Sequence, residues 1–448
     1  MDAIKPRFHF RPEQHWINDP NGTIYIDGYY HIFYQYNPTG EKWGNMHWGH
    51  TRTKDFIHYE EYKTLLAPQI ETGEEFCFSG SIAINKDGTP VLIYTSVQKD
   101  IDNNPNIQKA ILLDKNLEVF EEERISCLTA DMKDLPKVRN DWRDPYVFSE
   151  NGENYLVLAA AIGEKNEPSI LLFKDEDGKL INWKFENVLI KFKPVYELME
   201  CPNFFKLKDK YVLLGSPYSE VQYFTGYFNS ETLSFDKEHE GLLDHCSQFY
   251  ATNTIVDDVH DRTIVFAFVR GWTSFNKNWN NVISLPRTVD INDRGELIQK
   301  PIKEIKSLRE CVINDKSSET LDLLNVYKDV NKKYIQSELD FTIQLNEEGK
   351  VNLLLKEDSD TLCQILFTNS YVKFDSIYIP IEKTEDYEVK LFIDHSVLEI
   401  FINNGKECAT RVIENLNSLD TIEFRGDGNL SNLISYKMAS LDIKKTDK

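Results

Sequence analysis

Alternating apolar and polar residues fill most of the chain, in short runs separated by turn signals. Thr23–Ile26 and Tyr29–Tyr36 are rich in β-branched and aromatic residues and are joined by Asp27-Gly28. A dipeptide of this kind between two such runs is the strongest short-range signal of a β-hairpin. It recurs at Asp87-Gly88, Asn151-Gly152 and Asp177-Gly178. Helical periodicity is scarce, with one short candidate at 302–311, so the pattern predicts an all-β protein.

Five short motifs that combine polar and aromatic residues recur along the first 250 residues. They are the segments 16–22, 78–81, 142–145, 200–202 and 248–251. Measured from Asp19, Ser79, Asp144, Glu200 and Phe249, the gaps are 60, 65, 56 and 49 residues. Four antiparallel strands with their turns need about that length, as in one propeller blade. The spacing therefore predicts a five-bladed β-propeller in which each blade presents its innermost strand to a central axis.

The pattern changes after Leu-Pro-Arg at 285–287. Alternation resumes in Leu339–Leu345, Val351–Leu355 and Tyr387–Ile402, which predicts a C-terminal β-sandwich. All seven tryptophans precede residue 280, and indole rings suit stacking against sugars, so the chemistry is expected in the first region. We predict a propeller over 1–300, a short linker helix over 301–311 and a sandwich over 312–448.

Composition limits the classes of partner. The 448 residues include 73 acidic and 51 basic ones, which gives a formal net charge of −22. An acidic surface repels phosphate backbones and anionic lipid, so neither nucleic acid nor a membrane is expected as a partner. The longest apolar run, Tyr155–Ile162, is too short to span a membrane, and the N-terminal sequence lacks the apolar core of a secretory signal. The seven cysteines are scattered without a Cys-x-x-Cys pair, which predicts reduced thiols, no metal site and a cytoplasmic protein.

Three carboxylates lie on three of the predicted inner strands. Asp19, Asp144 and Glu200 are far apart in the sequence, but a propeller axis would bring them together. Asp19 and Asp144 directly precede a proline, and Glu200 is separated from Pro202 by one residue. We expect such prolines at strand ends because proline lacks an N–H. Carboxylates around a funnel are the groups that glycoside hydrolysis needs: a nucleophile, an acid and a group that stabilises positive charge.

The same motifs resemble the signature of glycoside hydrolase family 32, the invertase and fructanase family. The resemblance rests on Arg-Phe-His-Phe-Arg-Pro at 7–12, Trp-Ile-Asn-Asp-Pro-Asn-Gly at 16–22, Phe-Tyr-Gln-Tyr-Asn-Pro at 33–38, Trp43 with Met-His-Trp-Gly-His at 46–50, Phe-Ser-Gly-Ser at 78–81, Trp-Arg-Asp-Pro at 142–145 and Met-Glu-Cys-Pro-Asn at 199–203. Ser-Leu-Pro-Arg at 284–287 and the segment 392–401 extend it into the second region. It covers nearly the whole chain, in order.

The resemblance implies a fold, a reaction and a set of residues. The fold would be a five-bladed propeller followed by a β-sandwich, and the reaction would be hydrolysis of β-fructofuranosides with retention, without a cofactor. Asp19 resembles the nucleophile and Glu200 the general acid/base. Asp144 with Arg143 resembles the pair that holds fructose hydroxyls. The rest of the fructose subsite would be formed by Asn18, Gln35, Trp43, Phe78 and Ser79.

The chemistry sets requirements on two of these carboxyl groups. Asp19 must be ionised, and donors such as Asn18 and Arg143 would favour that form. Glu200 must begin protonated, which the nearby charges of Asp19 and Asp144 would favour. Trp43 and Trp48 would offer apolar faces to a sugar, although Trp48 fits the core equally well.

The leaving group is where the sequence departs from the family pattern. Gln248 replaces an acidic residue before Phe-Tyr-Ala, and Phe-Ala-Phe at 266–268 replaces a Trp-Gly-Trp-like strand, with Trp272 following. We expect these positions beside the leaving sugar. Selectivity for a phosphorylated sugar would need a Lys or Arg at the pocket mouth, and the sequence identifies none. Unphosphorylated sucrose and short fructo-oligosaccharides are therefore the expected substrates.

Several alternatives stay open. A sucrose-6-phosphate hydrolase and a fructosyltransferase share the same first step, and a catalytically silent fructan-binding protein would lack one of the three carboxylates. An inverting pentosidase on a related propeller is disfavoured by the segments 16–22 and 200–202. The sandwich would brace the propeller rather than bind glycan. The sequence gives no indication of oligomeric state.

Overall fold

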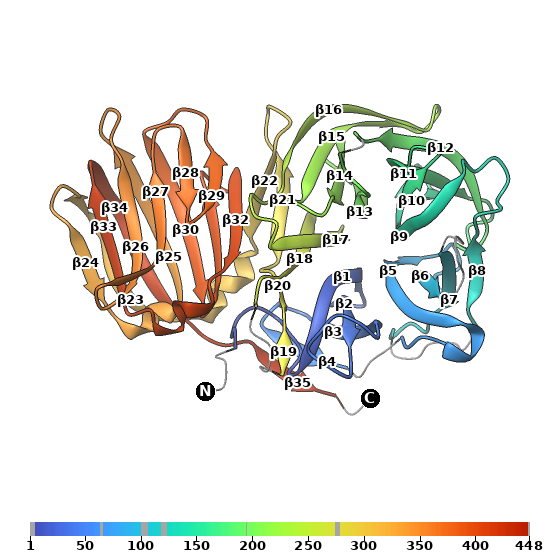
Figure 1. Cartoon of the computed structure of the whole chain (residues 1–448), viewed down its shortest axis with the longest axis horizontal. Helices are drawn as coiled ribbons and strands as arrows, with labels where there is room; N and C mark the ends of the chain where they lie inside the picture. Colours follow the sequence, from blue (N-terminus) through green and yellow to red (C-terminus); the bar gives the residue numbers. More distant parts are fainter. Residues whose placement is uncertain are drawn as a thin grey trace.

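Five sheets form the first part of the molecule. The computed structural model describes residues 5–62, 66–99, 106–117, 123–193, 195–273 and 278–446. Within these ranges the sheets stand around a common centre (Figure 1). Their successive strands are β1 (His15–Ile26), β2 (Tyr29–Asn37), β3 (His47–Thr53) and β4 (His58–Glu61); β5 (Glu74–Ile84), β6 (Pro90–Gln98), β7 (Ile107–Leu112) and β8 (Ile125–Leu128); β9 (Val138–Glu150), β10 (Glu153–Ile162), β11 (Glu167–Asp175) and β12 (Trp183–Lys191); β13 (Glu200–Leu207), β14 (Lys210–Ser216), β15 (Gln222–Asn229) and β16 (Ser234–Leu242); β17 (Phe249–Asp257), β18 (Arg262–Val269), β20 (Val282–Ile283), β21 (Arg287–Ile291) and β22 (Leu297–Pro301).

The first strand of each sheet lies nearest the centre. β1 contacts β5, β5 contacts β9, β9 contacts β13, β13 contacts β17, and β17 returns to β1. The short strand β19 (Trp279–Asn280) pairs in parallel with β1, and the C-terminal strand β35 (Asp442–Lys445) pairs in parallel with β4. Segments from later in the chain thus pair with both edge strands of this four-stranded unit, β1 and β4.

A β-bulge interrupts every innermost strand at its sequence motif. In β1 the pairing with β2 passes from Asn18 directly to Pro20, which leaves Asp19 outside the ladder. Equivalent register shifts occur within 77–80, 143–146, 200–203 and 250–253. Bulges re-aim side chains and are one of the few places where a sheet tolerates proline. The expectation that the prolines mark strand ends was therefore wrong for β1 and β9, where the prolines follow bulged residues inside the strands.

The second part is a sandwich of two six-stranded sheets, with the core between them. The first sheet contains β23 (Arg309–Asp322), β34 (Gly428–Met438), β25 (Gln336–Leu345), β30 (Asp386–Asp394), β31 (Val397–Ile402) and β32 (Glu407–Val412). The second contains β24 (Tyr327–Val330), β33 (Thr421–Gly426), β26 (Val351–Glu357), β27 (Asp360–Phe367), β28 (Tyr371–Phe374) and β29 (Ile377–Pro380). Alternate residues of both sheets are buried, which is the pattern that the sequence predicted. The all-β class, with a propeller-like first part and a sandwich, is confirmed.

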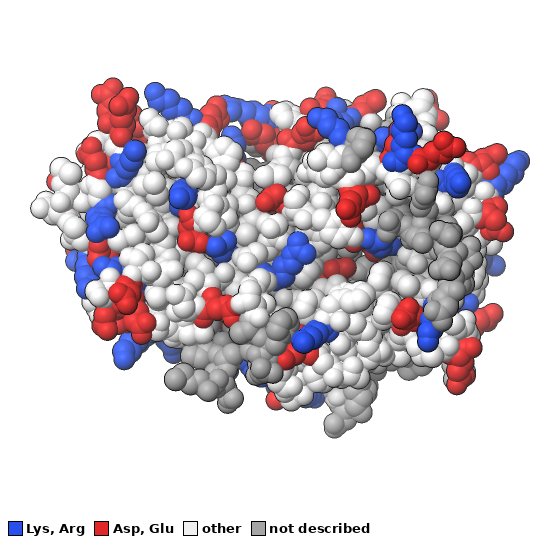
Figure 2. Space-filling view, viewed as in Figure 1, with Lys and Arg blue, Asp and Glu red and all other residues white. Residues whose placement is uncertain are grey.

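Helical structure is limited to short 3₁₀ segments in the described residues. They are η1 (Ile70–Thr72), η2 (Lys303–Leu308), η3 (Lys332–Ile335) and η4 (Glu414–Ser418). The helix expected over 302–311 is the 3₁₀ helix η2, because β23 already begins at Arg309. In the part of the chain that the structure describes, no helix is long and apolar enough to cross a membrane. On the face shown in Figure 2, acidic and basic side chains are scattered rather than gathered into one basic patch.

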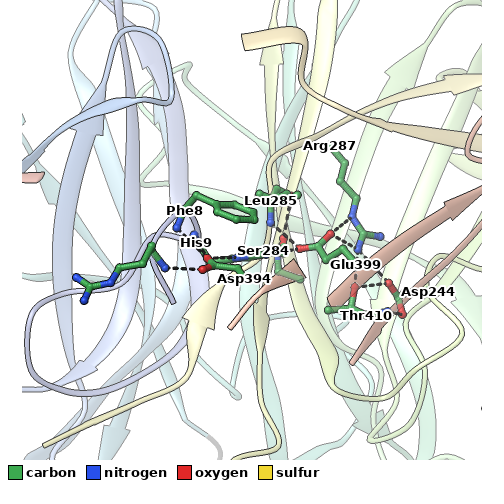
Figure 3. A network of polar contacts seen from close by, with 11 residues as sticks. Phe8, His9, Asp244, Ser284, Leu285, Arg287, Asp394, Glu399 and Thr410 are labelled. Carbon is green, nitrogen blue, oxygen red and sulfur yellow. Dashed lines mark hydrogen bonds and ion pairs between the residues drawn. The ribbon is translucent and has the colours of Figure 1, made fainter. Parts of the chain in front are cut away.

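Buried charged residues join the two parts of the molecule. We call His9, Asp244, Arg287, Asp394 and Glu399 the junction network (Figure 3). The His9 ring lies between Asp394 (Nδ1–Oδ2, 2.9 Å) and Glu399 (Nε2–Oε1, 3.1 Å). The Arg287 guanidinium bridges Glu399 (Nη2–Oε2, 2.7 Å) and Asp244 (Nη2–Oδ2, 3.1 Å). The network ties the N-terminal segment and the last sheet of the first part to strands β30 and β31 of the sandwich.

Candidate active site

A cavity of about 380 Å³ lies where the innermost strands meet. All nine residues that the sequence assigned to the site line this axial cavity: Asn18, Asp19, Gln35, Trp43, Phe78, Ser79, Arg143, Asp144 and Glu200. They come from β1, β2, β5, β9, β13 and the segment before β3. The described residues that line it further include Trp16, Tyr218, Tyr250, Phe268 and Arg270, and none of the lining residues belongs to the sandwich.

Asp19 is held by a short chain of hydrogen bonds. The Trp16 indole donates to Asn18 Oδ1 (2.8 Å), which turns the Asn18 amide so that its Nδ2 donates to Asp19 Oδ1 (2.8 Å). The Ser79 hydroxyl donates to Asp19 Oδ2 (2.8 Å). Burial raises the pKa of Asp19, and the neighbouring charge of Glu200 acts in the same direction, whereas the donors Asn18 and Ser79 oppose it. Both carboxylate oxygens are therefore fixed in place.

Asp144 lies at the bulge of β9 with a left-handed backbone (φ 65°). Its backbone N–H donates to Thr95 Oγ1 (2.9 Å), and its Oδ2 accepts from the backbone N–H of Cys201 (2.9 Å). Burial raises the pKa of Asp144 to about 7; the charges of Glu200 and Asp19 also raise it, while Arg143 lowers it. The structure thus places a strongly raised carboxyl pKa on Asp144.

Glu200 is surrounded by hydrogen-bond donors. Arg143 donates from Nη2 (2.7 Å) and Nε (3.2 Å) to Glu200 Oε1, which also accepts from the Tyr218 hydroxyl (2.9 Å). The Tyr250 hydroxyl donates to Oε2 (2.6 Å). Arg143, expected at sugar hydroxyls, is paired here with the predicted acid/base. The two tyrosine hydroxyls can donate to a carboxylate or accept from a carboxylic acid, so they suit either protonation state of Glu200.

Cys201 separates two of the carboxylates. Its buried sulfur lies 3.7 Å from Asp19 Oδ2 and 3.6 Å from Asp144 Oδ2. Burial and the adjacent acidic groups raise the pKa of this thiol well above its ordinary value. It is therefore a protonated neighbour of the carboxylates rather than a nucleophile.

Aromatic rings shape the entrance and the wall of the cavity. Trp43 is 53% exposed at the rim, with its ring centroid 6.2 Å from that of Phe78. Trp48, by contrast, is fully buried and donates its indole N–H to the carbonyl of Phe78 (3.0 Å). The core interpretation of Trp48 is the correct one. Next to these rings, Gln35 Nε2 is buried and has no hydrogen-bond partner among the described residues.

The leaving-group expectations need correction. Gln248 turns away from the axial cavity, because its Oε1 accepts from the backbone N–H of Val412 in the sandwich (2.8 Å). Trp272 packs against Trp279 and donates to Ser396 Oγ (3.0 Å), and Phe266 lies in the core. Of the positions singled out, only Phe268 lines the cavity.

The sequence reasoning missed three polar residues of the site. Tyr250 was inside a recognised motif, and its place at the bulge of an innermost strand was a signal that it faces the axis. Tyr218 follows β14 and Arg270 follows β18, in loops that no periodic pattern marks. The Arg270 guanidinium carbon lies 4.1 Å from the centroid of the Tyr250 ring.

Comparison with known protein families identifies the family to which this chain belongs. Residues 9–301 match the model of the N-terminal domain of glycosyl hydrolases family 32, and residues 304–440 match the model of the C-terminal domain of the same family. The chain belongs to glycosyl hydrolase family 32. The resemblance inferred from the motifs is thereby confirmed.

Family 32 relatives align with nearly the whole chain. The sucrose-6-phosphate hydrolase of Escherichia coli is 29% identical over 433 residues, which cover 90% of this chain and 88% of that protein. The raffinose invertase of Escherichia coli is 28% identical over 432 residues, which cover 90% of this chain and 87% of that protein. Among solved structures, fructan 1-exohydrolase IIa from Cichorium intybus in complex with 1-kestose matches with a TM-score of 0.86 at 21% identity, covering 99% of both chains. The sucrose-6-phosphate hydrolase from Lactobacillus gasseri matches with a TM-score of 0.84 at 24% identity, covering 98% of this chain and 94% of that one.

Proposed function

We propose that this family 32 protein is a retaining hydrolase that releases terminal β-D-fructofuranosyl residues from sucrose-type substrates by double displacement. The observation that carries the proposal is the convergence of Asp19, Asp144 and Glu200, from three sheets, on one cavity of about 380 Å³. Relatives that act on sucrose phosphate or hold 1-kestose support a small sugar as the substrate. The same carboxylates, all present, argue against a catalytically silent binding protein.

In the first step, Asp19 would attack the anomeric carbon of the fructosyl unit. Asn18 and Ser79 hold one oxygen each, so the carboxylate presents a fixed lone pair. Glu200 would give its proton to the glycosidic oxygen as the bond from that oxygen to the anomeric carbon breaks. The products of this step are a fructosyl ester on Asp19, the free leaving sugar and an ionised Glu200, which accepts hydrogen bonds from Arg143, Tyr218 and Tyr250.

In the second step, water would replace the leaving sugar. Glu200, now the base, takes a proton from that water as its oxygen attacks the anomeric carbon, and the ester bond to Asp19 breaks. Fructose leaves with its original configuration, and Glu200 is protonated again. The donors around Glu200 therefore stabilise the charge that this residue carries between the two steps.

The remaining wall suits the fructosyl ring. Asp144 presents a buried carboxyl group for ring hydroxyls, and the unpartnered Gln35 Nε2 is a donor that a ligand hydroxyl would satisfy. Trp43 offers an exposed apolar face at the entrance. We further propose that residues 1–300 form the catalytic domain, residues 301–311 connect it to the sandwich, and residues 312–448 brace it, because no described residue of the sandwich lines the cavity.

The test is the configuration of the first product. Purified protein is mixed with sucrose, and proton NMR is recorded before fructose mutarotates. We expect β-fructofuranose to appear first. An α-anomer appearing first would overturn the double displacement, and a kestose product in place of free fructose would favour a fructosyltransferase. Absence of any cleavage of sucrose, its 6-phosphate and 1-kestose would overturn the hydrolase itself.

A further inference from the structure

A second cavity, of about 440 Å³, lies between the two parts of the molecule, and we call it the junction cavity. The first part lines it with His260, Arg262 and most of the segment from Gln299 to Lys306. The sandwich lines it with residues of β25, β30 and β31 and with the turn at 404–405. In Figure 1 the contributing strand β22 lies beside the sandwich. The junction cavity and the axial cavity have no lining residue in common.

Strand β18 shows how far apart the two cavities are. Arg262, at the start of this strand, lines the junction cavity, whereas Phe268, near its end, lines the axial cavity. A strand rises about 3.3 Å per residue, so the two positions are roughly 20 Å apart along β18. A small molecule held at Arg262 is therefore too far from Asp19 and Glu200 to be a substrate of the proposed reaction.

Lysines recur at every third residue along one wall of the junction cavity. Lys300 lies in β22, Lys303 and Lys306 lie in the 3₁₀ helix η2, and all three line the cavity. A 3₁₀ helix has three residues per turn and rises about 2 Å per residue, so Lys303 and Lys306 share one face, about 6 Å apart. Ile302 and Ile305 fill the buried positions between them. The repeat therefore brings three ammonium groups to the same cavity.

The carboxylates on the opposite wall are mostly engaged by other basic residues. Lys390 pairs with Glu338 (Nζ–Oε1, 3.3 Å) and with Asp340. Arg309 adds a second ion pair to Glu338 (Nε–Oε2, 2.7 Å). Glu388 is the lining carboxylate that has no ion pair among the described residues, and it is exposed. The opposite wall therefore offers little negative charge to the lysine repeat.

The junction cavity has an excess of positive charge. Five basic and three acidic residues line it, which leaves two positive charges in a chain whose net charge is −22. Arg262 is held by Glu304 (Nη1–Oε1, 2.8 Å), and Lys390 is held as described above. In contrast, none of the three lysines of the repeat forms an ion pair within the described part of the chain. Uncompensated cations around a cavity are recognition groups for an anion.

We propose that the junction cavity binds a di- or triphosphate group through Lys300, Lys303 and Lys306. Linked phosphates carry enough negative charge to meet three ammonium groups at once, whereas a single sulfate or carboxylate would meet fewer. The lining residue Gln299 also accepts a hydrogen bond from Arg287 of the junction network (Nη1–Oε1, 3.2 Å). Binding would therefore brace the contact between the propeller and the sandwich. The inference does not depend on the proposed function.

The experiment uses inorganic triphosphate as the probe, at constant ionic strength and without divalent cations. Titration calorimetry should show saturable binding to one site, and the affinity should fall as salt is added. The melting temperature should rise with the concentration of triphosphate, because the ligand binds the folded protein. Sulfate at the same ionic strength should raise it less. ATP is the second arm: tighter binding than triphosphate would identify a nucleotide as the ligand, and equal binding would identify the phosphate chain alone.

Two double variants separate the lysine repeat from overall charge. Lys303→Gln/Lys306→Gln should weaken triphosphate binding at least about tenfold, because two charged contacts are lost. Lys115→Gln/Lys165→Gln makes the same change in net charge, from −22 to −24, at exposed positions far along the chain, and should keep the affinity. Arg270→Gln removes a cation from the axial cavity and should keep it too.

Four outcomes would overturn the assignment. They are the absence of saturable binding, an affinity that survives in Lys303→Gln/Lys306→Gln, an equal loss in the control double variant, and a loss in Arg270→Gln, which would place the ligand at the axis. If the repeat variant does not fold, Lys300→Gln, at an exposed position of β22, decides by comparison with Lys165→Gln. Cleavage of sugars is not measured, so failure of the proposed function would leave this test intact.

Discussion

The axial cavity and the junction network each contain three carboxylates, yet the protein neutralises their charges to different degrees. At the axis, Asp19, Asp144 and Glu200 share the cavity with the guanidinium of Arg143, which is paired with Glu200, and with that of Arg270. At the junction, Asp244, Asp394 and Glu399 face Arg287 and the ring of His9. Backbone N–H groups add to the second cluster: those of Arg7, Phe8 and His9 all donate to Asp394.

The ionisation of the two clusters follows from this difference. Burial raises the pKa of both Asp19 and Asp144 because too few donors compensate for it. Burial acts in the same direction on Asp394 and Glu399, but their partners His9 and Arg287 outweigh it and the pKa of each is lowered. Asp244 is the exception at the junction, since burial raises its pKa despite Arg287.

The comparison teaches how one fold uses buried charge in two ways. A paired and hydrogen-bonded cluster fixes how two parts of the molecule meet, although such a cluster adds little net stability over an apolar one. An incompletely neutralised cluster costs stability and keeps carboxyl groups able to exchange protons, which catalysis requires. Variants at the axis should therefore alter turnover, and variants at the junction should alter unfolding.

The largest expected effect is the loss of turnover in Asp19→Ala and in Glu200→Ala. In the proposed reaction each variant lacks a group that makes a bond or transfers a proton, and proton transfer alone contributes about 10²- to 10⁴-fold. We expect kcat for sucrose and for sucrose 6-phosphate to fall by at least that factor, while the melting temperature stays near that of the unaltered protein. Asp87→Ala, at an exposed hairpin turn, is the control and should leave kcat unchanged. A folded Asp19→Ala protein with ordinary turnover would contradict the nucleophile assignment.

At the junction, Arg287→Met should lower the free energy of unfolding by about 3–5 kcal/mol. The substitution keeps the apolar bulk but leaves Glu399 and Asp244 buried without their cation. The control is Arg294→Met, which removes an exposed ion pair worth about 0–1 kcal/mol. Urea unfolding of both variants measures the difference. Equal midpoints for the two variants would show that the junction network does not hold the molecule together.

The sequence predicted the axis far better than the junction, for a physical reason. The proposed catalytic carboxylates lie at bulges of innermost strands, and the motifs and their spacing predicted that these strands meet. The network partners His9 and Glu399 are 390 residues apart, and their contact depends on how two separate parts pack. No local pattern encodes that packing.

Two loop residues of the site, Tyr218 and Arg270, also could not be predicted from local sequence patterns. Tyr218 has a left-handed backbone (φ 62°) in the loop between β14 and β15, and Arg270 stands just beyond a strand end. Their directions are set by tertiary contacts with Tyr250 rather than by alternation. Trp48 illustrates the reverse case, because strand alternation does not distinguish a core face from a cavity face.

A smaller effect is expected from pH at the junction. Burial acts to lower the pKa of His9, but its hydrogen bonds to Asp394 and Glu399 raise it from 6.5 to about 9. The protonated ring therefore stabilises the folded protein fully below pH 6.5, and this contribution is lost as pH rises toward 9. His9→Gln should lower the urea midpoint clearly at pH 6 and much less at pH 9.5. The exposed His58→Gln is the control, and a pH-independent deficit in His9→Gln would contradict the charged-ring interpretation.

The smallest effect should have the opposite sign and come from the axis. The pKa of Asp144 is raised from 3.8 to about 7, so between these values the folded protein keeps a proton that the unfolded chain has released. Stability is therefore lost as pH rises through that window, and the carboxylate weakens the fold at pH 8. Asp144→Asn keeps an oxygen that can accept from the Cys201 N–H but carries no charge. We expect its melting temperature to exceed that of the unaltered protein at pH 8 by a few degrees, at about 1 °C for each kcal/mol in a chain of 448 residues, and to match it near pH 4. Turnover should fall by orders of magnitude. Calorimetry at both pH values measures this, and an Asp144→Asn protein less stable at pH 8 than the unaltered one would show that the axial carboxylates are as well compensated as those of the junction network.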